Sequence, residues 1–275
     1  MSEKKLTDST GSLVRLAHDN GVATVTLANP AGGNAFSVAM AQELAAAVKT
    51  IADDVAVRCV LLTGEGRFFS VGGDVKSMIA ADDVGVLLEQ ITDALHAAIT
   101  TLLRMDKPLV VAVNGPVAGG GLGLALSGDV VLAADAAHFS LAYSGIGFSP
   151  DAGATWLLPR LIGLRRTQEL AFLNTRLSSA EAVSLGLITR AVPDAELIAD
   201  ALAVAHKLAA GPVGAFAATR RLLLFSPFQS PEAQMSAEAL SVRAQATGAE
   251  GQEGLSAFVA RRPPSFAPLH VQQST

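Results

Sequence analysis

The most distinctive residues of the chain are glycines that follow an apolar run between positions 108 and 128. The run at 109–113 contains three valines and no polar residue, which is typical of a strand buried on both faces. An Asn-Gly-Pro turn ends it, and three consecutive glycines follow at 119–121. Glycines at a helix start leave backbone N–H groups unpaired and admit a ligand closely, because no Cβ blocks it. The stretch can therefore hold an oxygen that acquires negative charge, or simply allow close packing of helix against sheet.

A second glycine-rich turn, residues 68–74, follows another predicted strand at 57–63. Two such turns can each direct one N–H at the same point. Two donors on one carbonyl oxygen form an oxyanion hole, in which each donor is typically worth about 3–4 kcal/mol in acyl chemistry. The pair is therefore a more specific indication of catalysis than either turn.

A carboxylate, Asp151, follows the loop at 147–150. Aspartate is a favoured N-cap, so spacing alone favours a structural role for Asp151 as the cap of a helix that begins at Ala152. Asp74, which ends the earlier glycine turn, is likewise expected to cap or brace that turn.

Several other kinds of site lack their sequence motif. The glycine clusters contain no G-x-G-x-x-G pattern, no glycine precedes a lysine as in a P-loop, and no H-E-x-x-H occurs. The five histidines are scattered and the single cysteine has no partner, so we expect no metal site. A net charge of −5 without a basic stripe gives no support to nucleic-acid binding.

Composition predicts a folded protein with a large core, since the 275 residues are 50% hydrophobic and 16% charged. Cys59 lies in an apparent strand and is expected to pack in the core. The polar residues 1–11 do not form a secretory signal, so we expect a cytoplasmic protein. The uncharged stretch at 108–128 is long enough to cross a membrane, but its glycines and its turn argue against membrane association.

Strands and helices alternate in the first two thirds of the chain. Strands at 13–17 and 22–27 form a predicted hairpin, because Asn-Gly between them favours a tight turn. Ser37 is predicted to cap a helix that runs to about Ala52. From residue 178 the pattern is nearly all helical. Further predicted elements are helices at 84–105, 164–173, 195–210, 213–224, 230–247 and 251–260, strands at 129–134 and 187–192, and a short extended stretch at 138–141. We therefore divide the chain into a flexible N-terminus (1–12), a core (13–205) and a C-terminal helical region (206–275).

Five motifs in this order resemble the enoyl-CoA hydratase/isomerase (crotonase) superfamily over nearly the whole chain. The resemblance implies an α/β fold, a spiral of ββα units with a C-terminal helical trimerisation region. It also implies an acyl-CoA thioester substrate, no cofactor beyond that coenzyme A, and a homotrimer or hexamer. The motifs are Phe69-Ser70-Val71-Gly72-Gly73-Asp74, Asn114-Gly115-Pro116-Val117-Ala118-Gly119-Gly120-Gly121, Gly147-Phe148-Ser149-Pro150-Asp151-Ala152-Gly153-Ala154, Leu158-Pro159-Arg160-Leu161-Ile162-Gly163 and Phe258-Val259-Ala260-Arg261-Arg262-Pro263.

The resemblance also assigns roles to residues. It makes the backbone N–H groups of Gly73 and Gly120 the donors of the oxyanion hole, and it places the backbone near Val71 against adenine. His96 and Asp93 then lie on a helix that flanks the acyl pocket, where we expect solvated or packed roles. The other substrate- and CoA-binding candidates are Ser70, Gly72, Asp74, Tyr143, Phe148, Trp156 and Phe258, of which Phe148 and Trp156 are expected to be pocket wall or core.

The chain also departs from the pattern of the superfamily's hydratases. These carry two glutamates that hold water, and this chain has Gly123 and Tyr143 at the two positions. The usual arginine before the loop proline Pro30 is missing too. In its single carboxylate, Asp151, the chain resembles members of the superfamily that place Asp or Glu after a Gly-x-x-Pro loop. These include Δ3,Δ2-enoyl-CoA isomerases, the ring-epoxide isomerases of phenylacetyl-CoA degradation and 4-chlorobenzoyl-CoA dehalogenase.

With the resemblance taken into account, we favour Asp151 as a catalytic base over Asp151 as a helix cap. One base suffices for a 1,3 proton shift, so the sequence favours isomerisation of a 3-enoyl-CoA to a 2-enoyl-CoA. The alternatives are an enoyl-CoA hydratase with an atypical site, a ring-epoxide isomerase or dehalogenase that uses the same hole, and a non-catalytic acyl-CoA-binding protein.

Overall fold

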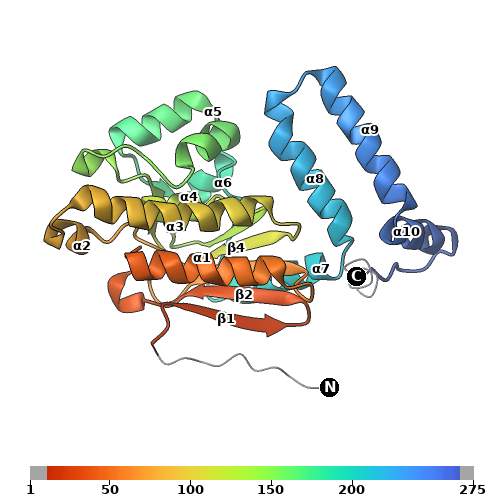
Figure 1. Ribbon diagram of the computed structural model, residues 1–275, viewed down its shortest axis with the longest axis horizontal. Helices are drawn as coiled ribbons and strands as arrows, with labels where there is room; N and C mark the ends of the chain where they lie inside the picture. Colours follow the sequence, from red (N-terminus) through yellow and green to blue (C-terminus); the bar gives the residue numbers. More distant parts are fainter. Residues whose placement is uncertain (1–10, 267–275) are drawn as a thin grey trace.

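The computed structural model of the protein describes residues 11–266 (Figure 1). Most of the predicted flexible N-terminus therefore lies outside the described residues. The central sheet has six strands in the order β1-β2-β3-β4-β6-β9, and all neighbours except β1 and β2 are parallel. These strands are β1 (Val14–Asp19), β2 (Val22–Leu27), β3 (Cys59–Gly64), β4 (Leu109–Val113), β6 (Val130–Ala134) and β9 (Arg190–Val192). The mixed α/β architecture predicted from the sequence is confirmed.

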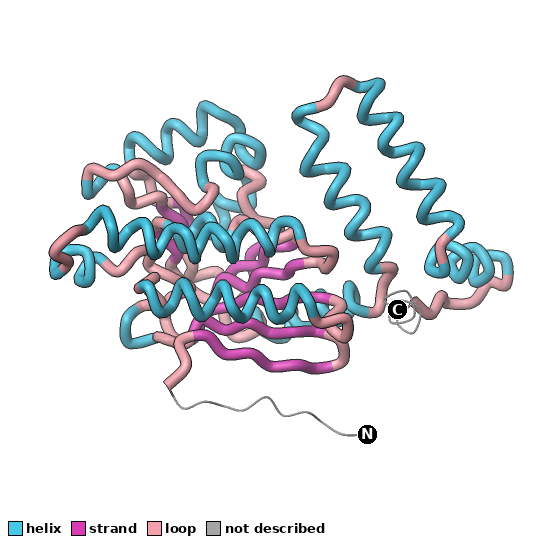
Figure 2. Tube along the Cα trace, viewed as in Figure 1, coloured by secondary structure: helices cyan, strands magenta, loops and turns pink. Residues whose placement is uncertain are grey.

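Helices cover the sheet and one end of the molecule (Figures 1 and 2). α1 and α3 lie side by side over one face, and α7 packs against β2, β3, β4 and β6. The helices are α1 (Val38–Asp53), α2 (Val75–Ala80), α3 (Val84–Arg104), α4 (Gly120–Ala125), α5 (Ala154–Leu173), α6 (Ser179–Ser184), α7 (Leu197–Ala209), α8 (Val213–Phe225), α9 (Pro231–Thr247) and α10 (Ala249–Val259).

Local chemistry explains the elements that the sequence predicted. The β1–β2 hairpin turns at Asn20 and Gly21, both with positive φ, as a tight Asn-Gly turn requires. The side chain of Ser37 accepts a hydrogen bond from the N–H of Met40 and so caps α1. The five apolar residues of β4 are fully buried between β3 and β6, which confirms the strand expected at 109–113.

A second, three-stranded sheet was not predicted. It consists of β5 (Val117–Ala118), β7 (His138–Ser140) and β8 (Leu177–Ser178). Two of its strands are only two residues long, which is too short to show the alternation of apolar and polar residues that indicates a strand. β5 matters for the site, because it pairs with the earlier glycine turn through a parallel bridge between Ser70 and Val117.

Helix α3 has the length and apolar composition of a membrane span, and among the described residues it is the one unbroken helix that does. Core helices of soluble proteins have the same composition. α3 packs along α1 and buries Ile91, Leu95 and Leu102, so we interpret it as a core helix.

Cys59 lies at the start of β3 and is fully buried, as expected of a core residue. Burial, with a smaller contribution from the charge of Asp129, raises the pKa of its thiol to about 12. A thiol that stays protonated at neutral pH is a poor nucleophile, so Cys59 packs rather than reacts.

The last three helices form an arm beside the core (Figure 2). The predicted boundary between residues 205 and 206 falls inside α7, whose residues Ala201, Ala205 and Ala209 are buried. Helix α9 buries none of its residues within the chain. The arm exposes many large apolar side chains, among them Leu223, Phe225, Phe228, Met235, Leu240, Val242, Leu255, Phe258 and Val259.

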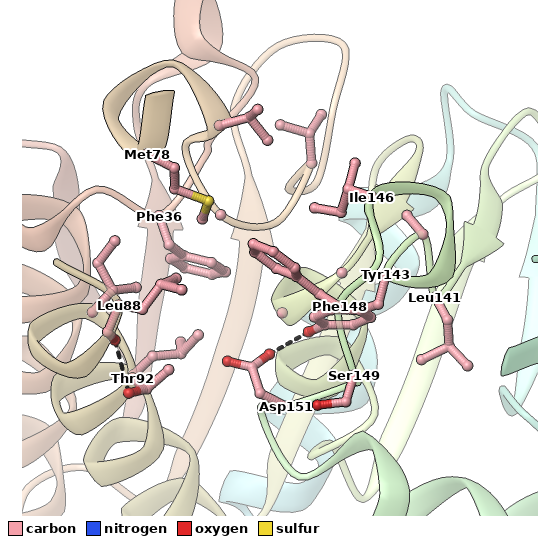
Figure 3. Close-up of a pocket in the computed structure, with 18 residues that line it drawn as sticks. Phe36, Met78, Leu88, Thr92, Leu141, Tyr143, Ile146, Phe148, Ser149 and Asp151 are labelled. Atoms are coloured by element: carbon pink, nitrogen blue, oxygen red, sulfur yellow. Dashed lines mark hydrogen bonds between the residues drawn. The ribbon is translucent and has the colours of Figure 1, made fainter. Parts of the chain in front are cut away.

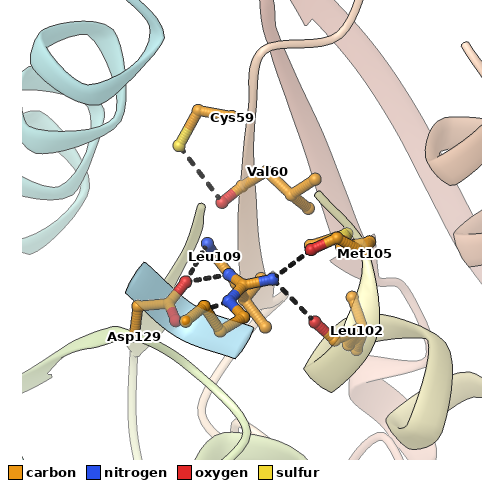
Figure 4. Close-up of polar contacts among 7 residues, drawn as sticks. Cys59, Val60, Leu102, Met105, Leu109 and Asp129 are labelled. Carbon is orange, nitrogen blue, oxygen red and sulfur yellow. Dashed lines mark hydrogen bonds and ion pairs between the residues drawn. The ribbon is translucent and has the colours of Figure 1, made fainter. Parts of the chain in front are cut away.

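Arg220 on α8 attaches the arm to the core. Its partners Leu102, Met105 and Asp129 are labelled in Figure 4. Its guanidinium pairs with both carboxylate oxygens of Asp129 and donates to the carbonyls of Leu102 and Met105. Asp129 in turn accepts from the N–H of Leu109, at the start of β4. The side chain of Arg220 is only 11% exposed, so its partners lose their donor without easy compensation from water when it is removed.

We therefore expect Arg220→Met to lower the free energy of unfolding by about 1–3 kcal/mol. The matched control is Arg221→Met, because Arg221 also pairs with an aspartate, Asp106, but both side chains are at least half exposed. Exposed pairs contribute about 0–1 kcal/mol. Urea unfolding of the two variants checks the prediction, and equal losses would show that Arg220 is not the anchor.

Candidate functional site

A cavity of about 490 Å³ lies between α3, the two glycine turns and the loop that leads into α5 (Figure 3). Apolar side chains form most of its wall, with Phe36, Met78 and Leu88 on one side and Tyr143, Ile146 and Phe148 on the other. Asp151 is the one carboxylate among the described residues that line it. The remaining lining residues are Val71, Gly73, Val75, Ile91, Thr92, Leu95, Gly119, Gly120, Leu141, Ala142 and Ser149.

The structure brings the two glycine turns together. A parallel bridge pairs Ser70 with Val117, and beyond it the backbone of Gly72 lies against Gly119 and Gly120. The approach is close: a Cβ on Gly72 would lie 2.9 Å from the carbonyl oxygen of Ala118. Gly72 also has a φ of +90° and Gly119 a φ of +55°, conformations that other residues adopt at a cost. Both turns therefore require glycine.

The N–H groups of Gly73 and Gly120 are the two donors predicted from the sequence. Both residues line the cavity, and neither N–H donates a hydrogen bond within the part of the chain that the structure describes. Gly120 is the first residue of α4, where a helix leaves its N–H groups without acceptors. Two unpaired donors at one cavity can bind one carbonyl oxygen.

Asp151 faces the cavity beside these donors. One of its carboxylate oxygens, Oδ1, lies 3.7 Å from the position that a Cβ on Gly120 would take. The reading of Asp151 as a helix cap is wrong, because α5 begins at Ala154, and the residue at its N-cap position is Gly153. Ala152 and Gly153 both have positive φ, and this left-handed pair delays the helix and turns the carboxylate toward the cavity.

Tyr143 donates its phenolic hydrogen to Oδ1 of Asp151 (Figure 3). Burial raises the pKa of the Tyr143 hydroxyl, and the charge of Asp151 raises it further. The hydroxyl therefore stays protonated and remains a hydrogen-bond donor. Tyr143 is one of the predicted binding residues, but nothing in the sequence indicates this contact, because Tyr143 and Asp151 lie on either side of an irregular loop.

His96 was expected to be solvated or packed, and the structure places it next to Asp151. Its Nε2 accepts a hydrogen bond from the N–H of Ala152 at 3.1 Å and lies 3.6 Å from Oδ2 of Asp151. An Nε2 that accepts from a backbone N–H carries no hydrogen, so His96 does not donate to the carboxylate in this arrangement. Its role here is to hold the left-handed Ala152, and nothing in the sequence near His96 indicates that contact.

Gly123 occupies the position where the resemblance places a hydratase glutamate. A Cβ there would lie 2.1 Å from the carbonyl oxygen of Ala152, which is an impossible contact. The backbone that follows Asp151 therefore fills the space of the missing carboxylate. No side chain fits at Gly123 unless this backbone moves.

A second cavity of about 500 Å³ adjoins the first, and both are lined by Val71, Gly73 and Val75. Its wall is more polar and includes Asn29, Ser37, Asp74 and Lys76. Asp74 also caps α2, as expected, and a hydrogen bond from the Ser77 hydroxyl lowers the pKa of its carboxyl.

Some of the other predicted binding residues line the cavities, and others do not. Val71 and Phe148 line the first cavity. Ser70 is fully buried, donates to the carbonyl of Asn34 and accepts from the N–H of Gly72, so it and the Gly72 N–H brace the turn. The polar groups of Ser70 and the N–H of Gly72 are therefore satisfied within the chain, and a direct ligand contact of these two residues stays a prediction.

Trp156 and Phe258 line neither of these two cavities. The ring of Trp156 packs under the guanidinium of Arg160, 4.0 Å away, on the surface of α5. Phe258 is 82% exposed near the end of α10 on the arm. Trp156 also packs against the hydrophobic core, which is one of the two roles expected for it. A ligand contact of Trp156 or Phe258 stays a prediction.

The chain is similar in sequence to proteins of one family. Residues 17–268 match the family model described as enoyl-CoA hydratase/isomerase. The chain is 37% identical to 1,2-epoxyphenylacetyl-CoA isomerase of Escherichia coli, over 91% of this chain and 97% of that protein. It is 38% identical to a probable enoyl-CoA hydratase of Rhodobacter capsulatus, over 92% of this chain and 97% of the relative.

A solved structure of similar fold is the enoyl-CoA hydratase/isomerase from Mycobacterium abscessus. The TM-score is 0.89 at 30% identity, with 92% of this chain and 98% of the other covered. Isomerase and hydratase names both occur among the relatives, so the comparisons identify the family and not the reaction. By sequence, fold and the two glycine turns, this chain belongs to the enoyl-CoA hydratase/isomerase family.

Proposed function

We propose that the protein is an acyl-CoA isomerase that moves the double bond of a 3-enoyl-CoA to the 2-position, with Asp151 as its single base. The observation that carries the proposal is the position of this one carboxylate beside two unpaired N–H groups in an apolar cavity. A carboxylate base next to an oxyanion hole is what removal of a proton α to a thioester carbonyl needs.

The residues define the following sequence of steps. The thioester oxygen accepts hydrogen bonds from the N–H groups of Gly73 and Gly120. Oδ2 of Asp151 removes a proton from C2, and the electron pair moves into a dienolate whose negative oxygen the two donors stabilise. The carboxylic acid then returns the same proton to C4. The C3–C4 double bond becomes a C2–C3 double bond, and Asp151 is a carboxylate again.

Hydration is less well supported by the site. Adding water across a double bond uses a base for the water and an acid for the carbanion, and the described cavity contains one carboxylate. The space of a second acid at Gly123 is filled by backbone, and the hydroxyl of Tyr143 is committed to Asp151.

A ring-epoxide isomerase is the second candidate. The observation that favours it is the 37% identity to the isomerase of Escherichia coli with that substrate. The aromatic rings of Phe36 and Phe148 at the cavity would suit a cyclic acyl group. In either case we propose that the adjoining polar cavity receives the coenzyme A portion, and that the apolar arm joins copies of the chain into a trimer or hexamer.

Product analysis tests the proposal. We expect the purified protein to convert a 3-enoyl-CoA into the conjugated 2-enoyl-CoA, which absorbs in the ultraviolet, without forming a 3-hydroxyacyl-CoA. Chromatography and mass spectrometry distinguish the two products, because hydration adds the mass of water. A hydroxylated product from a 2-enoyl-CoA would favour the hydratase, and binding without turnover of enoyl or ring-epoxide substrates would favour a non-catalytic protein.

A further inference from the structure

The carboxylate of Asp151 has two oxygens in different environments. Oδ1 accepts the hydrogen of Tyr143, whereas no hydrogen bond from the described residues reaches Oδ2. Nε2 of His96 lies 3.6 Å from Oδ2, and its lone pair is already used by the N–H of Ala152. One oxygen is therefore occupied and the other is available to substrate.

Hydrogen bonds of the surrounding loop hold Tyr143 in place, so that its hydroxyl stays at Oδ1 of Asp151. Its carbonyl accepts hydrogen bonds from the N–H groups of Ile146 and Phe148, each at 3.0 Å. The preceding residue, Ala142, has a φ of +61° and donates its N–H to the side chain of Asn174 at 2.9 Å. The phenol thus comes from a fixed point on the loop, and its ring forms part of the cavity wall.

We infer that Tyr143 is a positioning residue that occupies Oδ1 of Asp151, so that Oδ2 alone takes the proton from the substrate and returns it. This inference rests on the proposed isomerisation and deepens it. A carboxyl group free to rotate would present either oxygen, and the acquired proton could then be exchanged with water, because the side chain of Asp151 is 32% exposed. With Oδ1 held, the proton stays beside the substrate until it is delivered to C4.

The inference predicts retention of an isotope label. A 3-enoyl-CoA that carries deuterium at C2, converted in ordinary water, should give a 2-enoyl-CoA with most of the transferred deuterium at C4. In Tyr143→Phe the ring and its packing remain, but the hydrogen bond is lost. We expect kcat to fall about 10-fold or more with KM within about twofold, because a hydrogen bond to a charged group is lost. Deuterium at C4 should drop toward the solvent-exchanged level.

Ser144→Ala is the matched control. It also removes a hydroxyl group from this loop, but Ser144 does not line the cavity. It should behave as the wild type in kcat, KM and deuterium retention. Loss of retention in Tyr143→Phe but not in Ser144→Ala supports the positioning role, whereas equal retention in the two variants overturns it. Complete exchange in the wild type also overturns it.

The inference and the proposed function can fail separately. If Asp151→Asn is inactive and Tyr143→Phe keeps the kcat and the deuterium retention of the wild type, Asp151 is the base but Tyr143 does not position it. If Asp151→Asn isomerises the substrate as well as the wild type, the proposed function itself is wrong.

Discussion

Asp151→Asn is expected to lower kcat for isomerisation of a 3-enoyl-CoA by at least about 10³-fold while the thioester still binds. The amide has nearly the shape of the carboxylate and can still accept the hydrogen bond from Tyr143, but it cannot take a proton. General acid–base groups typically contribute 10²- to 10⁴-fold, and here one group would perform both proton transfers. Steady-state kinetics with calorimetric binding of an acyl-CoA measures the two quantities.

Asp93→Asn is the control for this prediction, because it makes the same chemical change on helix α3 at an exposed residue that does not line the cavity. We expect it to leave kcat and KM unchanged within about twofold. A fall of similar size in both variants would indicate a general loss of charge or folding. Full activity of Asp151→Asn would remove the base from the mechanism.

Gly120→Pro is expected to reduce kcat/KM by about 10²- to 10³-fold, because it deletes one of the two N–H donors. Proline is tolerated at the first position of a helix, and Gly120 holds that position in α4. The preceding Gly119 has φ 55° and ψ −133°, the mirror image of the extended conformation that usually precedes proline. The substitution therefore removes the donor with limited disturbance of the backbone.

Gly120→Ala separates the donor from the added volume. Both variants bring a Cβ to within 3.2 Å of Leu95, but only alanine keeps the N–H. We expect Gly120→Ala to lose less than about tenfold in kcat/KM and to unfold at a temperature similar to that of the proline variant. Equal losses in the two variants would assign the effect to crowding and not to the donor.

Much of this arrangement could be predicted from local sequence. The hairpin, the capped helix α1 and the buried strand β4 each depend on residues close together in the chain, such as Asn20 and Ser37. The glycine turns could also be predicted, because positive φ and close backbone approach favour glycine at Gly72 and Gly119. These features follow from local backbone chemistry.

The surroundings of Asp151 could not be predicted in the same way. His96 reaches Ala152 across 56 positions of the chain, and only the packing of α3 against the loop brings them together. The start of α5 was predicted at Ala152, but the helix begins at Ala154. Ala152 adopts a left-handed conformation that alanine rarely takes, so its residue type does not indicate this turn. The two-residue strand β5 was missed for want of length, although it sets the register of the two glycine turns.

In the proposed reaction, the amides of Gly73 and Gly120 share one thioester oxygen beside Asp151. The most direct measurement is a crystal structure of Asp151→Asn with a 3-enoyl-CoA bound. We predict the thioester oxygen within about 3.2 Å of both backbone nitrogens, a normal hydrogen-bond distance, and C2 and C4 on the side of the cavity that residue 151 faces. A thioester oxygen that contacts neither nitrogen, or an acyl chain directed away from residue 151, would contradict the account.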